Sequence, residues 1–488
     1  MYINNKILVG KNETTETNII PKMANRHGMI SGATGSGKTI TLKVLAESFS
    51  SAGIPVFLVD IKGDLAATTK SGVTNSNIES RLTKLNIENF EFKKFPITFW
   101  DVYGEFGHPI RTTVSSIGSR LLSKMLNLSP VQEGVLAIIF KIAEDENLEI
   151  IDLKDLKSIL SYVGDKRKEY TLEYGNITVQ SIGAIQRNIL TLEEEGGDYF
   201  FGKPSLEIND FIRFDGETGN GYINILHASK LFQKPNLYST FLLWLLTDLY
   251  NKMPEVGDLE KPKLVFFFDE AHLLFDDMPE HLLEKITQIV KLIRSKGIGL
   301  YFISQNPSDV PDEILSQLGN RIQHVLRYYT KNDEKAIKAA ANSFRINPAF
   351  DTEEEIKNLA TGEALVSFLD EKGQPSIVEK VTILPPQSLM GAITDEERKK
   401  FIEESYLYNK YEKKIDEESA FEKIEKENEK KQEELEEEKK KKEKEEQEKK
   451  EKKKKPSKIE KAIDKFTNSA ISTLGRKIGN SIFKKLFK

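Results

Sequence analysis

Cysteine is absent from all 488 residues of the chain. Its absence excludes disulfide bonds, thiolate nucleophiles and cysteine-based zinc sites, and it fits a reducing compartment. Long apolar runs are also missing, since the longest near-apolar stretch, at residues 241–249, is interrupted by Thr247 and Asp248. The sequence therefore predicts no transmembrane segment.

An excess of positive charge is lacking too, because the formal net charge is −5. The chain as a whole thus offers no basic surface for nucleic acid, although a local basic lining in a pore remains compatible with this balance. Near the start, Asn4, Asn5 and Lys6 interrupt any apolar signal-peptide core. We therefore expect a cytoplasmic protein.

What the chain does contain is a glycine-rich phosphate-binding pattern, G-x-x-x-x-G-K-[ST]. Glycines let the backbone curl so that successive N–H groups point at phosphate oxygens. Lys38 can reach the β- and γ-phosphates, and the hydroxyl of Thr39 can bind Mg²⁺. The predicted nucleotide-binding residues are Gly32, Ala33, Thr34, Gly35, Ser36, Gly37, Lys38 and Thr39.

The surroundings of this pattern agree with it. Met29 and Ile30 precede it as a short apolar strand would, and apolar residues at helical spacing follow it until Gly53. The positive N-terminus of that helix would face the same phosphates. ATP and Mg²⁺ are therefore the expected cofactors, and a chance glycine-rich turn is the rejected alternative.

Two carboxylates follow the apolar run at residues 264–268. A Mg²⁺–nucleotide site needs an acidic group at the end of a strand near the threonine of the phosphate loop, and Asp269 fits this role directly or through water. Hydrolysis also needs a base that orients the attacking water, and Glu270 fits that role. Lys38 and Glu270 are thus predicted to be catalytic.

Further candidates follow the next predicted strand, at residues 300–303. Gln305 could sense the γ-phosphate, and its alternative role is that of a satisfied turn amide. Arg294, Arg321 and Arg327 are candidates for an arginine finger, in the same or a neighbouring subunit, and each could instead form a structural ion pair. We favour Arg321 because it lies at the start of the next predicted strand after the one at residues 300–303.

Apolar runs that alternate with helical patterns predict an α/β fold with a mainly parallel sheet covered on both faces. Residues 109–215 are mainly helical and indicate an insertion, while residues 363–369 and 377–384 predict a closing hairpin. The expected segments are a lead segment 1–27, a core in two parts (28–108 and 216–386) around the helical insertion 109–215, a charged helical linker 387–456, and a basic amphipathic helix 457–488.

The linker and the final helix differ in composition. Residues 422–455 are almost entirely lysine and glutamate, with Ile424 and Leu435 as the apolar exceptions, so a coiled-coil seam is excluded. Glutamates four residues before lysines favour a solvated helix over disorder. Apolar residues at helical spacing within 457–488, opposite a basic face, predict an amphipathic helix. This helix would dock on a membrane surface or a partner, or pack on its own oligomer.

Several motifs together resemble HerA-like ATPases of the HerA–FtsK group, and more narrowly its bacterial branch of uncharacterised function. The motifs lie at residues 31–39, 59–65, 98–104, 264–275, 292–297, 304–307, 317–321 and 362–370. The resemblance implies a RecA-like P-loop NTPase fold, ATP hydrolysis with Mg²⁺, and a homo-oligomeric ring, expected to be a hexamer. It also implies that Asp60, Lys62, Gly63 and Asp64 belong to the rim of the site.

Two functions follow from the resemblance and the tail. The favoured one is a DNA translocase or helicase-like ring that acts on double-stranded DNA. The alternative is an ATPase ring that acts on a protein partner, or at a membrane surface through residues 457–488. A small-molecule kinase is disfavoured because it has little use for the paired carboxylates of Asp269 and Glu270. A GTPase is disfavoured because Asn251 and Lys252 lack the aspartate that a guanine-specificity motif requires.

Overall fold

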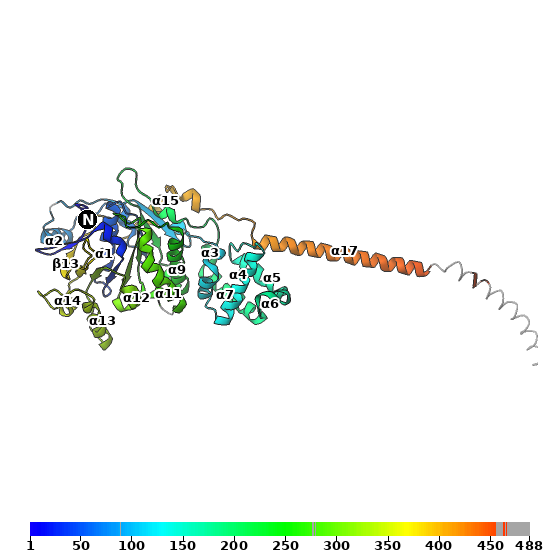
Figure 1. The fold of residues 1–488 in the computed structure, drawn as a ribbon. Coiled ribbons are helices and arrows are strands. Elements are labelled where there is room, and N and C mark those ends of the chain that lie inside the picture. Colours follow the sequence, from blue (N-terminus) through cyan, green and yellow to red (C-terminus); the bar gives the residue numbers. More distant parts are fainter. Residues whose placement is uncertain (88, 276–277, 279, 455–461, 464, 466–488) are drawn as a thin grey trace, which may run out of the picture. The chain divides into compact units, whose positions relative to one another are not determined.

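The computed structural model describes residues 1–488 except 88, 276–277, 279, 455–461, 464 and 466–488 (Figure 1). Contacts between Cα atoms divide the chain into two units, Met1–Phe421 and Glu422–Lys488. All strands of the described residues belong to the first unit, where they form one thirteen-stranded sheet. This sheet carries the residues on which the functional analysis rests.

The centre of the sheet is parallel. Its strands, in spatial order, are β11 (Asn320–Gln323), β4 (Gly28–Ser31), β10 (Ile298–Ser304), β9 (Leu264–Phe268), β5 (Val56–Asp60), β8 (Ile223–His227), β6 (Ile97–Asp101) and β7 (His108–Pro109). Most of these strands are buried along their whole length, as strands covered on both faces must be. The predicted α/β class with a mainly parallel sheet is confirmed.

An antiparallel extension continues the sheet beyond β11. It consists of β12 (Glu363–Ser367), β13 (Glu379–Ile383), β2 (Lys6–Lys11), β1 (Tyr2–Ile3) and β3 (Glu16–Ile19). The hairpin β12–β13 was predicted, whereas the strands within residues 1–27 were not. Lys11 pairs with Thr382, so the first residues are bound to a strand far along the chain, a contact that local sequence does not report.

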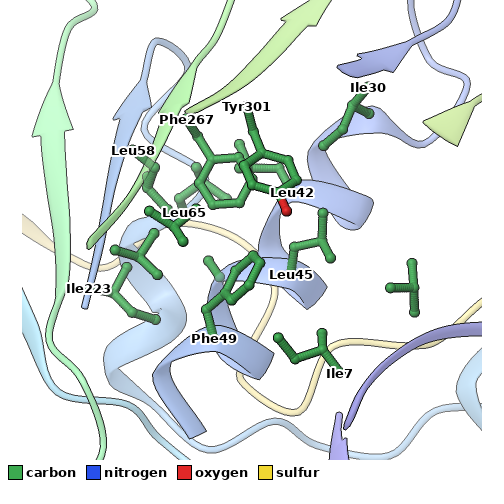
Figure 2. Packing of buried hydrophobic residues seen from close by; sticks show 14 of the residues in the cluster. Ile7, Ile30, Leu42, Leu45, Phe49, Leu58, Leu65, Ile223, Phe267 and Tyr301 are labelled. Carbon is green, nitrogen blue, oxygen red and sulfur yellow. The ribbon is translucent and has the colours of Figure 1, made fainter. Parts of the chain in front are cut away.

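Helix α1 (Lys38–Ser51) covers one face of the sheet. Its residues Leu42, Leu45 and Phe49 are buried and point at Phe267 and Tyr301 of the central strands (Figure 2). Phe49 meets the rings of Phe267 and Tyr301 with centroids 6.2 and 5.8 Å away. Since each buried side chain of this size stabilises the fold by about 2 kcal/mol, this contact fixes the helix that follows the phosphate loop.

The opposite face is also closed by aromatic side chains. Phe57 of β5 and Phe266 of β9 stack with ring centroids 4.3 Å apart, and Phe211 packs on both rings. The long helix α9 (Pro235–Lys252) is almost completely buried in the same unit. Alternate residues of β5 and β9 thus pack on opposite faces, as the two-residue repeat of a strand requires.

Between β7 and β8 the chain forms the predicted helical insertion (Figure 1). Its helices are α3 (Val114–Met125), α4 (Pro130–Asp145), α5 (Leu153–Asp165), α6 (Arg167–Tyr174), α7 (Val179–Glu195) and α8 (Gly197–Phe200). Side chains at the helix starts explain two of these boundaries. Ser129 and Asp152 each accept backbone N–H groups in capping boxes that begin α4 and α5.

The remaining helices of the first unit flank the strands. They are α2 (Ser76–Leu85), α10 (His272–Phe275), α11 (Glu280–Leu292), α12 (Asp312–Leu315), α13 (Lys331–Asn342), α14 (Thr352–Asn358), α15 (Asp395–Glu403) and α16 (Tyr408–Tyr411). The last two belong to residues 387–421, which the sequence analysis assigned to the linker. In the structure this segment packs within the first unit.

A buried carboxylate attaches the start of that segment to α1. Glu47 accepts hydrogen bonds from the backbone N–H groups of Gln387 (2.6 Å) and Ser388 (3.2 Å) and from the Ser388 hydroxyl. Lys43, one turn earlier, donates to the carbonyl oxygen of Leu389. We call these contacts of Lys43 and Glu47 with residues 387–389 the α1 clasp. Helix α1 and residues 387–389 lie far apart in the sequence, so the sequence carried no sign of these contacts. We therefore assigned this segment to the linker from its composition.

In the second unit, the described residues form most of α17 (Ala420–Lys454), as the lysine–glutamate pattern predicted. Glu427 and Lys431 form an i,i+4 ion pair at 2.6 Å, a geometry that supports exposed helices. The predicted helix 457–488 lies outside the described residues, apart from positions 462, 463 and 465. Among the described helices, none combines the length and apolar composition needed to cross a bilayer.

The α1 clasp yields a stability prediction. Glu47→Ala should lower the free energy of unfolding by about 3 kcal/mol, because it leaves buried donors without an acceptor and Lys43 without its nearby charge. Urea denaturation monitored by fluorescence would measure the change. Glu13→Ala, in an exposed turn, is the matched control and should change stability by less than about 0.5 kcal/mol. Equal midpoints for both variants would contradict the clasp.

Candidate functional site

The phosphate loop connects β4 to α1 at the carboxyl end of the parallel strands. Gly35 and Gly37 have φ angles of +76° and +116°, which side chains with a Cβ atom rarely adopt. The ammonium group of Lys38 donates to the carbonyl oxygens of Gly32 and Ala33 and so lies along the loop. The predicted glycines therefore occupy the positions where the turn requires them.

The loop opens into a pocket of about 290 Å³. Residues from several strand ends line it: Thr34, Gly35, Gly37, Lys38, Thr39, Ile40, Leu42, Val59, Asp60, Ile61, Lys62, Asp64, Leu65, Asp269, Glu270, Ile303 and Thr361. The structure thus brings most of the predicted nucleotide-binding residues together with both predicted carboxylates. It also places Asp60, Lys62 and Asp64 at the pocket, as the family resemblance implied.

Asp269 follows β9 directly and is buried. Burial and, after it, the negative charge of Glu270 raise the pKa of Asp269 to about 6, although the backbone N–H of Glu270 and the charges of Lys38 and Lys62 act in the opposite direction. A divalent cation would stabilise the charged form of such a carboxylate. Thr39 and Asp269 line the same pocket and supply the hydroxyl and carboxylate oxygens that Mg²⁺ prefers. The residues present therefore fit a Mg²⁺–nucleotide.

Glu270 has a left-handed backbone, with φ of +48°. The turn is held in place by the N–H of Ala271, which donates to the carbonyl oxygen of Ile303 on β10 at 2.8 Å. The Oε2 atom of Glu270 is buried and accepts no hydrogen bond from the described residues, while Nδ1 of His272 lies 3.4 Å away. An unpaired carboxylate oxygen at the pocket is suited to accept a hydrogen bond from water.

His324 packs beside the phosphate loop and bonds to the start of α1, a role that the sequence did not predict. Its Nδ1 is 2.8 Å from the carbonyl oxygen of Glu363, and its Nε2 is 2.8 Å from the hydroxyl of Thr41 in α1. A carbonyl only accepts, so Nδ1 donates and Nε2 accepts from Thr41. Burial lowers the pKa of His324 to about 4, which keeps the ring neutral. A lone histidine in an apolar run gave no signal of this contact.

Gln305 and Arg321 do not line the pocket. Gln305 follows β10 but is exposed, so its sensor role remains a prediction. The guanidinium of Arg321 donates to three backbone carbonyl oxygens, those of Leu315, Leu318 and Ser343, each at 3.1 Å. These bonds hold the guanidinium against its own chain and away from its own pocket, and the arginine-finger role of Arg321 stays a prediction.

Sequence comparison finds curated relatives of known name. The chain is 24% identical over 380 residues to the DNA double-strand break repair helicase HerA of Sulfurisphaera tokodaii, covering 75% of this chain and 67% of that protein. It is 25% identical over 365 residues to the protein of the same name from Saccharolobus solfataricus, covering 74% and 64%. The chain thus matches about two thirds of the length of these relatives.

Solved structures of two proteins share this fold. VirB4 of Thermoanaerobacter pseudethanolicus superposes with a TM-score of 0.50 at 16% identity, covering 79% of this chain and 97% of that one. The plasmid coupling protein TrwB in complex with an ATP analogue gives a TM-score of 0.52 at 13% identity, covering 81% and 97%. At such identities the likeness establishes the fold alone.

The family match is more extensive than any of these pairwise alignments. It covers residues 5–488, which is almost the whole chain and includes the phosphate loop, both strand-end carboxylates and the antiparallel extension apart from β1. The protein therefore belongs to the helicase HerA-like C-terminal family.

Proposed function

We propose that this protein is a Mg²⁺-dependent ATPase that assembles into a homo-oligomeric ring, a hexamer, and drives movement along double-stranded DNA. The observation that carries the ATPase is the single pocket in which Lys38, Thr39, Asp269 and Glu270 meet. Support for DNA as the substrate comes from relatives named DNA double-strand break repair helicase. We also propose a cytoplasmic location, from the sequence features described above.

In this proposal each group of the pocket has a separate task. Lys38 and the N–H groups of the loop bind the phosphates, and Thr39 and Asp269 would hold Mg²⁺, which would supply positive charge beside the phosphate oxygens. Glu270 accepts a hydrogen bond from the attacking water through Oε2, which has no hydrogen bond with any described residue, and aligns that water with the γ-phosphorus. The products are ADP and inorganic phosphate.

In the proposed ring, a neighbouring subunit supplies the arginine that a single subunit does not bring to its own pocket. In the described part of the chain, no arginine lines the pocket. Arg294 and Arg327 are exposed, unlike the bound Arg321, so either can reach a neighbouring subunit as an arginine finger. Cryo-electron microscopy of Glu270→Gln with ATP and duplex DNA would identify the stoichiometry, the finger and the DNA-facing residues.

A second candidate function rests on the amphipathic pattern of residues 457–488. In it, the ATPase ring acts on a protein partner or at a membrane surface through that segment. Co-sedimentation of the full chain and of residues 1–456 with anionic vesicles separates the two functions. Stronger binding by the full chain would support the alternative, and equal binding would remove the membrane role.

Two substitutions test the assignment within the pocket. Lys38→Ala should weaken nucleotide binding and abolish turnover, because the lysine contacts the phosphates in both the ground and transition states. Glu270→Gln should retain ATP but reduce turnover by about 100-fold or more, since an amide cannot act as a base. Steady-state hydrolysis and nucleotide binding would be measured on the full chain. Normal turnover by Glu270→Gln would exclude it as the base.

The substrate is tested by the effect of DNA on hydrolysis. Turnover of the wild-type protein should rise when double-stranded DNA is added, and the effect should weaken as salt increases, because phosphate contacts release counterions. Glu270→Gln with the same DNA is the control for background hydrolysis. Intact ATP turnover without stimulation by any DNA would favour the protein or membrane alternative.

A further inference from the structure

Lys62 enters the pocket from the side opposite the phosphate loop. The sheet order β4–β10–β9–β5 places the loop after β4, the two carboxylates after β9, and Lys62 after β5. Because these strands are parallel, their carboxyl ends share one edge of the sheet. Lys38 and Lys62 therefore flank Asp269 and Glu270 from the two sides.

The backbone beneath Lys62 is held firmly. Both carboxylate oxygens of Asp60 accept backbone hydrogen bonds, one from Gly63 at 2.7 Å and one from Leu65 at 3.2 Å. The hydroxyl of Ser229 donates to the carbonyl oxygen of Ile61 at 2.6 Å. Asp60 thus closes a tight turn around Lys62, with Gly63 at φ of +77°.

The side chain of Lys62, in contrast, is exposed and has no hydrogen bond or ion pair with any residue that the structure describes. Its charge nevertheless acts on the pocket. Burial lowers the pKa of Lys38 and Lys62 lowers it further, while Lys62 opposes the burial that raises the pKa of Asp269. A cation on a fixed turn, close to the phosphate-binding lysine but bound to neither carboxylate, is available for a ligand.

We propose that Lys62 binds the terminal phosphate of ATP from the side opposite Lys38, and that Asp60 is a positioning residue for this contact. The inference rests on the proposed ATPase function and adds a means of distinguishing ATP from ADP. Two ammonium groups on opposite sides of the γ-phosphoryl group stabilise the charge on its oxygens. ADP lacks that group, so Lys62 contributes to the affinity for the triphosphate alone.

The test compares nucleotide affinities of Lys62→Met with those of the wild-type protein. Calorimetry in Mg²⁺ should show the Kd for a non-hydrolysable ATP analogue rising about tenfold, with the Kd for ADP unchanged within about twofold. Turnover should also fall, and Lys62→Arg should restore most of the affinity. Equal losses for both nucleotides, or no loss for either, would overturn the proposal.

Lys372→Met is the matched charge control. Lys372 is exposed in the β12–β13 turn, and β12 is antiparallel to β11, so this turn lies at the edge of the sheet opposite the pocket. The affinities of the Lys372→Met variant for the ATP analogue and for ADP should equal those of the wild-type protein. A similar tenfold loss in this variant would attribute the effect of Lys62→Met to net charge and would overturn a specific contact.

Asp60→Asn tests the positioning role, because an amide keeps the shape of the side chain but not its two accepting oxygens. It should lower the affinity for the ATP analogue and not for ADP, and it should add nothing to Lys62→Met in the double variant. Additive losses would show that Asp60 acts independently of Lys62. Failure of Lys38→Ala to stop turnover would count against the ATPase itself, whereas failure of Lys62→Met alone would count only against this inference.

Discussion

The pocket exists because four parallel strands end at one edge of the sheet. The hydrogen-bonded register of the strands aligns Ser304 with Ser31 and Phe302 with Phe268. The phosphate loop, the turn after β10 and the two carboxylates therefore lie side by side. More than two hundred residues separate the loop from Asp269 along the chain. Apolar packing on both faces holds that register, and the polar groups lie one or two residues beyond the strand ends, where pairing stops.

Much of this arrangement could be predicted from sequence, since it is encoded locally. The strand ending at Phe268 is a continuous apolar run, and its predicted bounds agree with β9. The glycine pattern before Lys38 identified the loop and the start of α1. Asp269 and Glu270 followed from their place after a strand, and the structure brings them to the pocket. Each inference needed no more than about ten consecutive residues.

What could not be predicted depends on contacts between distant segments. The bonds that occupy Arg321, the support of the loop by His324, and the pairing of Lys11 with Thr382 all join parts of the chain with no common pattern. Gln305 also follows a strand, but it is exposed and does not line the pocket, so its sensor role stays a prediction. The left-handed backbone at Glu270 is held by the hydrogen bond from the N–H of Ala271 to the carbonyl oxygen of Ile303 in β10. Glutamate itself has no preference for this conformation.

The α1 clasp joins helix α1 to the segment that follows β13. Lys38 begins this helix at the phosphate loop, and Glu47, nine residues later, grips the segment that leaves the core after β13. Between these two points the helix is held against the sheet by Phe49, whose ring packs on that of Phe267. One continuous helix therefore spans the distance between the nucleotide-binding loop and the backbone amides of residues 387 and 388.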